Sequence, residues 1–310
     1  MTIQQLHYVI TIADAGSFNK AAEALYIAQP SLTSAVQNLE KEIGITIFHR
    51  SGHGVALTND GMEFINYARQ VYTPYETLTR KYSGKGSVKK KFGISTQHYS
   101  FVVKSFVEAA KKLDTNGYEF AIRETKTREV IEDVNLMRSE IGVIYLCDFN
   151  RKVLLKLLKS NDLVFHKLIE CSAYVYLWKG HPLAGRKSLT LEELTNYPAL
   201  AFEQGSGSSF YFAEELLSTN EYPRTIKATD RATMLNLMVG LNGYTLCSGI
   251  ICEELNGSDY KAVPLDLGGQ NAENRMEIGY LTKKNIVPGE MTERLIEEMK
   301  RYLSPLAQAD

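Results

Sequence analysis

Two short amphipathic segments separated by a tight break, in residues 16–50, constrain this 310-residue chain more than any other feature. Ser17 is placed to cap a first helix, because its hydroxyl can accept a hydrogen bond from an otherwise unpaired backbone N–H. Ala21 and Ala22 give that helix a small-residue face that lets a second helix approach closely. The second helix begins at Gln29, whose following proline is tolerated in a first turn. The segment therefore predicts two packed helices joined by a turn.

The second helix presents two different faces. Leu32, Val36, Leu39 and Ile43 recur at helical spacing and predict a buried stripe, and Gly44 ends the helix. Polar side chains occupy the opposite face: Ser31, Ser34, Gln37, Asn38 and Lys41. Apolar residues at 45–48 and 55–57 then bracket a turn, which predicts a short hairpin, or wing. Such a winged helix-turn-helix places its second helix in a DNA major groove. A small helical bundle with no nucleic-acid role is the alternative.

The run AAEALYIAQPSLTSAVQNLEKEIGITIFHR, followed by LTNDG, resembles the N-terminal module of LysR-type transcriptional regulators. The resemblance implies a sequence-specific DNA-binding protein with double-stranded operator or promoter DNA as a partner. Together with the helix faces, it places these residues at DNA: Ser17, Gln29, Pro30, Ser31, Thr33, Ser34, Gln37, Asn38 and Arg50.

Charge gives little general attraction to nucleic acid, since the net charge is -1 and residues 1–60 hold three basic against five acidic side chains. Phosphate contacts must then come from helix N-termini, backbone amides and polar side chains. Non-specific affinity for DNA is expected to be modest, so dimerisation matters more.

The cysteines argue against a metal or disulfide framework. Cys147, Cys171, Cys247 and Cys252 form no C-x-x-C pair and have no matching histidine cluster, so we expect reduced, buried thiols and no metal or cofactor. We expect no signal peptide, because the first helix, residues 3–15, is amphipathic, and no uninterrupted apolar run reaches membrane-spanning length. The expected location is the cytoplasm.

A long helix is predicted from residue 59 to about residue 82, with Thr58 as its cap. Apolar residues spaced by three or four form a face too long for one small module to bury, and predict pairing with a second copy: Met62, Ile65, Ala68, Val71, Tyr72, Tyr75 and Leu78. The resemblance likewise implies a homodimer, and a homotetramer built from it. Pro74 predicts a kink or an early end.

Residues 83–87 read as a hinge, because glycine and serine dominate them. The basic run between Arg80 and Lys91 is either a solvated charge run or a contact to the DNA backbone. With 310 residues, two or three compact units are expected.

From residue 92 the pattern alternates between strands and helices, which predicts a parallel sheet covered on both faces. A second unit of the same kind is predicted from residue 163, including a helix at 210–218, and the last strand and helix (277–281 and 291–303) return to the first unit. We therefore predict an α/β fold with these parts: a winged helix-turn-helix at 1–58, a linker and dimerisation helix at 59–88, and an effector domain at 89–310. Its first lobe comprises 89–162 and 270–310, and its second lobe 163–269.

The downstream part also resembles the same family. SEIG at 139–142, HPLA at 181–184 and GLNGY at 240–244 fall where LysR-type regulators place their effector domain. That resemblance implies two α/β lobes like those of periplasmic binding proteins, with a small molecule between them.

Two polar loops and one helix start are the predicted effector contacts, because parallel sheets bind ligands at the carboxyl ends of their strands. The predicted residues are Ser95, Thr96, Gln97, Gln204, Ser206, Thr229 and Arg231. The family resemblance implies the roles of Ser95 and Thr96. Each hydroxyl is otherwise a helix cap, and Arg231 otherwise pairs with a neighbouring acid.

A ligand-responsive transcriptional regulator is therefore the predicted function, and RNA polymerase is a further candidate partner. The hydroxyl-rich loops favour a small anionic or amino-acid-like effector. The stretches STQHYSFV and DRATMLNLMVGLNGYT resemble Gram-positive regulators of sulfur amino-acid metabolism. A constitutive regulator with a vestigial cleft is the alternative. An enzyme is a third reading, and the absence of a recognised nucleophile motif argues against it, so we expect no catalytic residue.

Overall fold

A computed structural model describes residues 1–51, 54–82, 89–113, 117–205, 209–268 and 275–306. The chain divides into two compact units, Met1–Val88 and Lys89–Asp310, and each is considered by itself. The predicted hinge at 83–87 lies outside the described residues.

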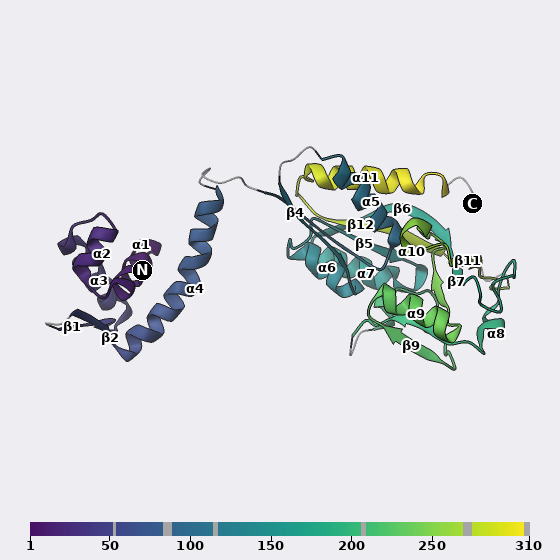
Figure 1. Cartoon of the computed structure of the whole chain (residues 1–310), viewed down its shortest axis with the longest axis horizontal. Coiled ribbons are helices and arrows are strands. Elements are labelled where there is room, and N and C mark those ends of the chain that lie inside the picture. Colours follow the sequence, from purple (N-terminus) through teal and green to yellow (C-terminus); the bar gives the residue numbers. More distant parts are fainter. Residues whose placement is uncertain (52–53, 83–88, 114–116, 206–208, 269–274, 307–310) are drawn as a thin grey trace. The chain divides into compact units, whose positions relative to one another are not determined.

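The N-terminal unit is the predicted winged helix-turn-helix (Figure 1). It contains α1 (Ile3–Ala15), α2 (Phe18–Ala24), α3 (Gln29–Ile43), the antiparallel hairpin of β1 (Phe48–Ser51) and β2 (Gly54–Leu57), and α4 (Asn59–Tyr82). Ser17 caps α2 as predicted, with its Oγ accepting from the Lys20 N–H at 3.5 Å. Leu32, Val36 and Leu39 are buried together with Val9 and Ile12 of α1. The stripe on α3 thus fixes this helix against the unit.

Helix α4 differs from the sequence-based prediction in its length beyond Pro74 and in the burial of part of its apolar face. It continues through Pro74 to Tyr82, so the early end predicted at the proline is wrong. A proline removes one hydrogen bond of the helix, and on this exposed stretch water can bind the freed carbonyl. Ile65, only 3% exposed, and Ala68 pack into the core of their own unit, so they cannot serve as a seam to a second copy. The first turn of α4 lies close to the backbone at Ile47. Gly61 permits this close approach, because a Cβ there would collide with the Ile47 carbonyl.

The C-terminal unit is built on a five-stranded sheet with the order β4-β3-β5-β12-β6. These strands are β3 (Lys90–Thr96), β4 (Tyr118–Glu124), β5 (Ile141–Leu146), β6 (Leu163–Ser172) and β12 (Arg275–Lys283). β3, β4 and β5 are parallel, but β12 runs antiparallel to both β5 and β6. The sheet is therefore mixed rather than purely parallel. β6 leaves the sheet at the carboxyl end, so the returning strand starts there and must run the opposite way.

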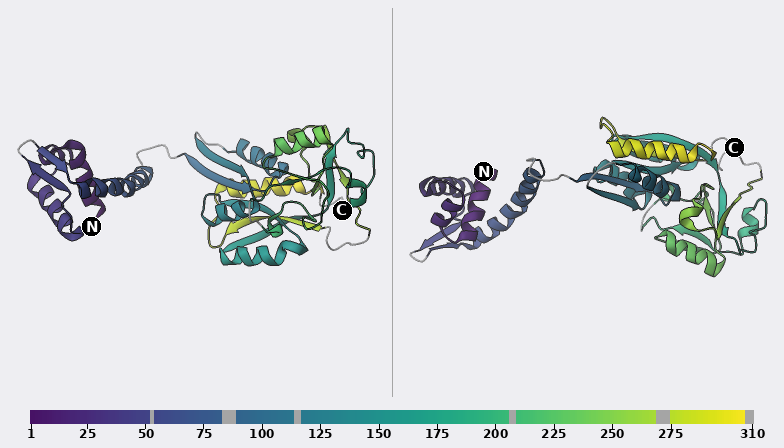
Figure 2. Two further views of the ribbon diagram at one scale, coloured as in Figure 1. Left: turned by 90° about the horizontal axis from the view of Figure 1, so that it is seen from below. Right: turned by 45° about the horizontal axis from the view of Figure 1, so that its top comes forward.

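Helices cover both faces of this sheet (Figures 1 and 2). Successive side chains of β5 point to opposite faces of the sheet and belong to different cores. Val143 and Tyr145 belong to the core that includes α5 (Ser100–Lys111) and α11 (Glu290–Leu303), whereas Ile144 and Leu146 pack with α6 (Thr127–Asn135) and α7 (Asp148–Ser160). The sequence analysis missed α7 and β6. It also assigned residues from 163 onward to the second lobe, whereas β6 pairs with β12 in this first sheet.

The remaining strands form smaller sheets. β10 (Thr245–Cys247), β7 (Tyr174–Trp178) and β11 (Tyr260–Pro264) make one sheet, and β8 (Ala199–Phe202) pairs in parallel with β9 (Thr225–Ala228). With α8 (Leu191–Leu194), α9 (Arg231–Leu241) and α10 (Glu253–Asn256), they form what we call the second lobe; the five-stranded sheet and its helices are the first lobe.

The predicted helix at 210–218 is wrong. Only the short 3₁₀ helix η1 (Phe210–Phe212) forms, and Leu217 adopts a left-handed backbone conformation with φ of 56°. The carboxylates of Glu214 and Glu215 accept hydrogen bonds from the backbone N–H groups of His98 and Phe202. These contacts hold the segment in an irregular path that a regular helix could not follow.

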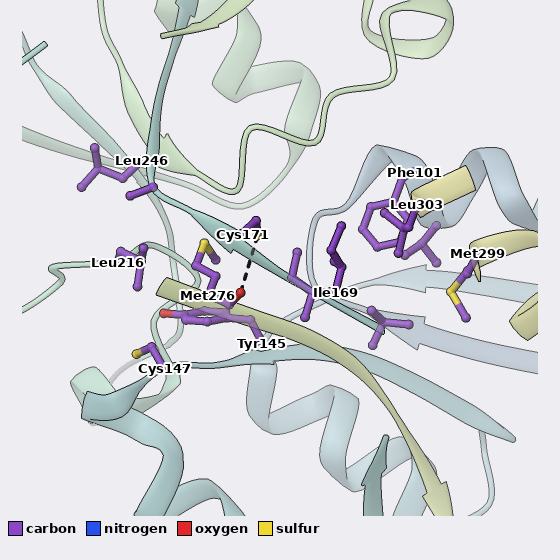
Figure 3. Packing of buried hydrophobic residues seen from close by; sticks show 14 of the residues in the cluster. Phe101, Tyr145, Cys147, Ile169, Cys171, Leu216, Leu246, Met276, Met299 and Leu303 are labelled. Atoms are coloured by element: carbon purple, nitrogen blue, oxygen red, sulfur yellow. Dashed lines mark hydrogen bonds between the residues drawn. The ribbon is translucent and has the colours of Figure 1, made fainter. Parts of the chain in front are cut away.

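One hydrophobic core joins the two lobes (Figure 3). It extends from Phe101, Met299 and Leu303 in the first lobe through Ile169, Cys171 and Met276 on the crossing strands. It continues into the second lobe, where Leu216 and Leu246 belong to it. The Cys171 thiol also donates to the Met276 carbonyl across 3.6 Å. The lobes of this unit are therefore packed together rather than joined by linkers alone.

Candidate functional site

Helix α3 presents the predicted polar face to solvent. Pro30, Ser31, Ser34, Gln37 and Asn38 are all exposed, on the side opposite the buried stripe. Gln29 and Thr33 are half-buried and bound to each other, because the Gln29 amide donates to the Thr33 hydroxyl at 3.0 Å. The exposed residues thus form a continuous polar surface on one helix.

The other predicted DNA residues lie elsewhere. Ser17 is half-buried and is used as the cap of α2. Arg50 belongs to β1 by its backbone, but its side chain lies outside the described residues. Sequence reasoning missed Tyr26, which is 96% exposed in the turn before α3 and has a positive φ of 54°. A bulky residue in that conformation cannot be recognised from residue type, which favours glycine or asparagine there.

The loop after β3 forms a buried hydrogen-bond network rather than a binding surface. The Ser95 hydroxyl donates to Asp133 at 2.5 Å, and the Thr96 hydroxyl donates to the Gln97 carbonyl at 2.8 Å. The Gln97 side chain donates to Thr127 and accepts from the Tyr145 N–H. None of the three predicted residues lines the cavity between the lobes. Their polar groups are used to fix β3 against its neighbours.

The next residue, His98, carries the contact between the lobes. Its backbone N–H and ring Nδ1 both reach Glu214 Oε2, at 3.0 and 2.9 Å. Its ring stacks on Phe202 with a centroid distance of 3.7 Å. Gln204 donates to Glu214 Oε1 and accepts from the Thr127 N–H. Sequence reasoning missed His98 and Glu214, because nothing in the sequence indicates that residues 116 positions apart meet.

A cavity of about 90 Å³ lies between the lobes beside this contact. His98 and Ser100 line it from the first lobe, and Arg231, Thr245 and Ser248 from the second. Methionines and aliphatic side chains form its apolar part: Met234, Met238, Leu246, Ile250, Ile251 and Met276. A few polar groups converging on an apolar cavity are typical of a small-molecule site.

Arg231 is the one predicted effector residue that lines this cavity. Its guanidinium pairs with Glu124 of the first lobe and donates to Asn256 at 3.3 Å. Thr229 is exposed and does not line the cavity, and Ser206 lies outside the described residues. Gln204 lines a second cavity in the second lobe instead. Arg231 therefore pairs with an acid, Glu124, and at the same time lines the cavity in which an anion could bind.

Glu215 borders the same cavity and is 8% exposed. Burial, with the charge of Glu214 as a second cause, raises the pKa of Glu215 to about 8. Its carboxyl is therefore mostly neutral at pH 7. A neutral carboxyl carries an O–H donor.

The raised pKa of Glu215 predicts a pH-dependent stability. Because the folded chain binds this proton more tightly than the unfolded chain, the stabilisation is fully present below the ordinary carboxyl pKa of 4.5 and is lost as the pH rises toward 8. We expect the unfolding free energy of the wild type to fall relative to Glu215→Gln by up to about 1.4 kcal/mol per pH unit between about pH 5 and 8. Urea unfolding at several pH values, followed by the fluorescence of Trp178, measures the unfolding free energy of both proteins.

Glu221→Gln is the control for this experiment, because Glu221 is exposed. This variant should follow the wild type at every pH. A difference between wild type and Glu215→Gln that stays constant across the pH range would contradict the assignment of a raised pKa to Glu215.

No three His, Cys, Asp or Glu side chains in the described ranges gather closely enough to hold a metal ion. None of the helices within those ranges is both long and apolar enough to cross a membrane.

Comparisons with known proteins agree with the fold. The chain is similar to the HTH-type transcriptional regulator TfdT of Cupriavidus pinatubonensis, with 41% identity over 26% of this chain and 36% of that protein. It is similar to the regulator CysL of Bacillus subtilis, with 26% identity over 70% of each chain. The structure of a Corynebacterium glutamicum OxyR C206 mutant matches with a TM-score of 0.63 and 20% identity, over 99% of this chain and 94% of that one.

Two family descriptions match consecutive parts of the chain. Residues 3–62 match the bacterial regulatory helix-turn-helix of the LysR family, and residues 116–304 match the LysR substrate binding domain. The first match covers the winged helix-turn-helix, and the second covers most of the two-lobed unit, including the second-lobe side of the interlobe cavity. The chain therefore belongs to the LysR family of DNA-binding transcriptional regulators that carry an effector-binding domain.

Proposed function

We propose that this LysR-type regulator reads DNA with the exposed face of α3 and senses a small anionic or amino-acid-like molecule in the cavity between its lobes. The observation that carries the DNA part is the division of α3: three buried apolar residues fix the helix, and its whole opposite side is polar and exposed. The proposal places the protein in the cytoplasm, as a DNA-bound regulator without catalytic activity. RNA polymerase is a further proposed partner.

The proposed DNA contacts on α3 are uncharged. Ser34, Gln37 and Asn38 are short donors and acceptors suited to base edges, while the exposed first turn of α3 offers free backbone N–H groups to phosphate. Tyr26, which precedes that turn, adds an exposed aromatic ring with a hydroxyl. Because the contacts from α3 lack positive charge, specificity should depend strongly on two helices binding neighbouring half-sites together.

A carboxylate on the α3 face tests the DNA contact. Ser34→Glu should reduce operator affinity at least about a hundredfold, because the added charge meets phosphate oxygens and acceptor edges of bases. The fold should persist, since Ser34 is exposed. Fluorescence anisotropy with operator DNA measures it, and Gln70→Glu, an exposed change on α4, is the charge-matched control. Operator affinity equal to that of the control would remove α3 from the interface.

We propose that α4 makes a homodimer, and that dimers associate further into a tetramer. Val71, Tyr75, Leu78 and Tyr82 are exposed along one side of this helix, with Leu78 58% exposed. Such a row of large apolar side chains on one helix favours a partner helix of the same kind. Ile65 and Ala68 support the seam only indirectly, by fixing the start of α4 to the unit's core.

A charge in this row tests the dimer. Leu78→Asp would bury an unpaired carboxylate between two copies, so the dimer should weaken at least about a hundredfold. Sedimentation velocity over a concentration series measures this. Thr73→Asp places the same charge on the opposite side of α4 and should leave the dimer intact. An unchanged dimer in Leu78→Asp would mean that the copies associate through another surface.

The proposed effector acts on contacts that hold the two lobes together. Arg231–Glu124 and Lys104–Glu254 are ion pairs from one lobe to the other, and His98 pairs with Glu214 beside the cavity. A cavity of about 90 Å³ is smaller than the roughly 150 Å³ that accepts benzene in an engineered protein. An amino-acid-sized effector therefore requires the lobes to separate. Its anionic group would compete with Glu124 for Arg231, which couples binding to lobe position.

A ligand screen tests the sensing role. Full-length protein is heated with small inorganic anions, amino acids and O-acylated amino acids, and a ligand present at 100 times its Kd should add about 2.7 kcal/mol of stability. Arg231→Gln should lose this response to an anionic ligand, whereas Arg224→Gln, at an exposed position in the second lobe, should keep it. If none of these compounds stabilises the wild type or alters its operator affinity, the constitutive alternative with a vestigial cleft is favoured.

A further inference from the structure

A second cavity, of about 250 Å³, lies within the second lobe and is separate from the interlobe cavity. One wall is the β8–β9 sheet, with Ala199 and Ala201 of β8 lining it. Leu216 and Tyr222, from the irregular segment after η1, line it from another side, and Leu246 of β10 completes it. This cavity exceeds the roughly 150 Å³ that accepts benzene in an engineered protein.

The small side chains of β8 help to leave this space open. Leu200 and Phe202 also border the cavity, but they pack with Met234 and Met238 of α9. Ala199 and Ala201 alternate with them along β8 and leave the opposite face thinly covered. The segment that crosses this face does not form the regular helix that would fill the space. Thr225, Lys227 and Asn220 line the cavity at exposed positions, so a ligand can enter it from solvent.

The lining defines the chemistry of the occupant. Alanine, leucine and tyrosine side chains suit an aromatic ring or a branched aliphatic group. Lys227, paired in register with Ala201, lines the cavity at an exposed position and has no carboxylate partner among the described residues. An unpaired ammonium at the mouth of an apolar cavity favours a carboxylate on the ligand. Glu215 borders the inner side, and because burial raises its pKa to about 8, it adds little negative charge at pH 7.

We propose that this cavity is a second ligand site, which takes a small aromatic or branched aliphatic carboxylate with its apolar group against Ala199, Ala201 and Leu216 and its carboxylate at Lys227. The site is independent of the effector role proposed for the interlobe cavity. The two cavities share a wall made of Phe202, Glu215, Thr245 and Leu246. Since Phe202 also stacks on His98, occupation of the second site is placed to alter the contact between the lobes.

Phenylacetate is the probe, titrated into the full-length protein by calorimetry at constant ionic strength, with acetate as the ringless comparison. We expect phenylacetate to bind at least about tenfold more tightly than acetate, because its ring becomes buried. Ala201→Leu fills the cavity and should weaken phenylacetate at least about tenfold. Ala232→Leu adds the same atoms at an exposed position of α9 and should have no effect.

The charge at the mouth is tested separately. Lys227→Gln should weaken phenylacetate about three- to tenfold, whereas Lys187→Gln, an exposed lysine away from the cavity, should not. Lys227 is exposed, so this variant decides the question even if Ala201→Leu fails to fold. Arg231→Gln should retain saturable binding of phenylacetate, because Arg231 lines the interlobe cavity and not the second cavity.

Several results would overturn the proposal. These are no saturable binding of phenylacetate, equal affinities for phenylacetate and acetate, or unchanged affinity in a folded Ala201→Leu or in Lys227→Gln. Loss of phenylacetate binding in Arg231→Gln would place the ligand between the lobes instead. None of these outcomes depends on DNA binding, so the proposed regulatory function can stand or fall independently.

Discussion

The antiparallel pairing of β6 with β12 is the interaction on which the C-terminal unit depends. It runs over the whole of both strands, from Leu163 opposite Lys283 to Ser172 opposite Arg275. The second lobe lies in the chain between those strands, so their hydrogen bonds hold its two ends side by side. The register shifts at Gly279, where a Cβ would collide with the His166 carbonyl, so only glycine fits there. Two adjacent crossings leave the two lobes connected by a narrow pair of strands, an arrangement typical of hinged domains.

The contacts across that cleft combine a hydrophobic base with polar contacts beside it. Cys171 and Met276, at the ends of the crossing strands, belong to a core shared by both lobes, which opposes complete separation. The Arg231–Glu124 ion pair and the His98–Glu214 hydrogen bond lie beside the cavity, where the proposed anionic effector would compete with Glu124 for Arg231. Under the proposed sensing role, the apolar base would supply stability, and the Arg231–Glu124 pair would supply the response to a ligand. Charged groups respond to an arriving ion far more than apolar contacts do.

The N-terminal unit separates its tasks in a similar way. The buried side of α3 and the first half of α4 share one core, to which Ile65 contributes, and this core fixes the angle between the two helices. The exposed side of α3 and the exposed row ending at Leu78 on α4 are the surfaces that we propose contact DNA and a second copy. Because both surfaces belong to helices fixed to one core, association of two copies would set the spacing of two reading helices. That spacing supplies specificity that uncharged side chains alone would not.

The sequence by itself determined the elements whose signals are local. The caps and the 3.6-residue period of α1 to α4 depend on neighbours within a few positions, so Ser17, Thr58 and the Leu32–Val36–Leu39 stripe were predicted correctly. The buried strand β5 is likewise an unbroken apolar run. The same local reading put Ile65 in a seam between copies, because spacing shows that a face is apolar but not what covers it.

Only the tertiary structure decided which polar groups meet. The sequence predicted ligand contacts at the end of β3, at Ser95, Thr96 and Gln97. In the structure these side chains instead form hydrogen bonds with Asp133, Thr127 and neighbouring backbone. His98 and Glu214 are joined only by the return of the chain through the second lobe. The direction of β12, the irregular path at 210–218 and the cavity behind β8 likewise depend on contacts between distant segments. Periodicity and capping carry no information about such contacts, because their energies arise only when the chain has folded.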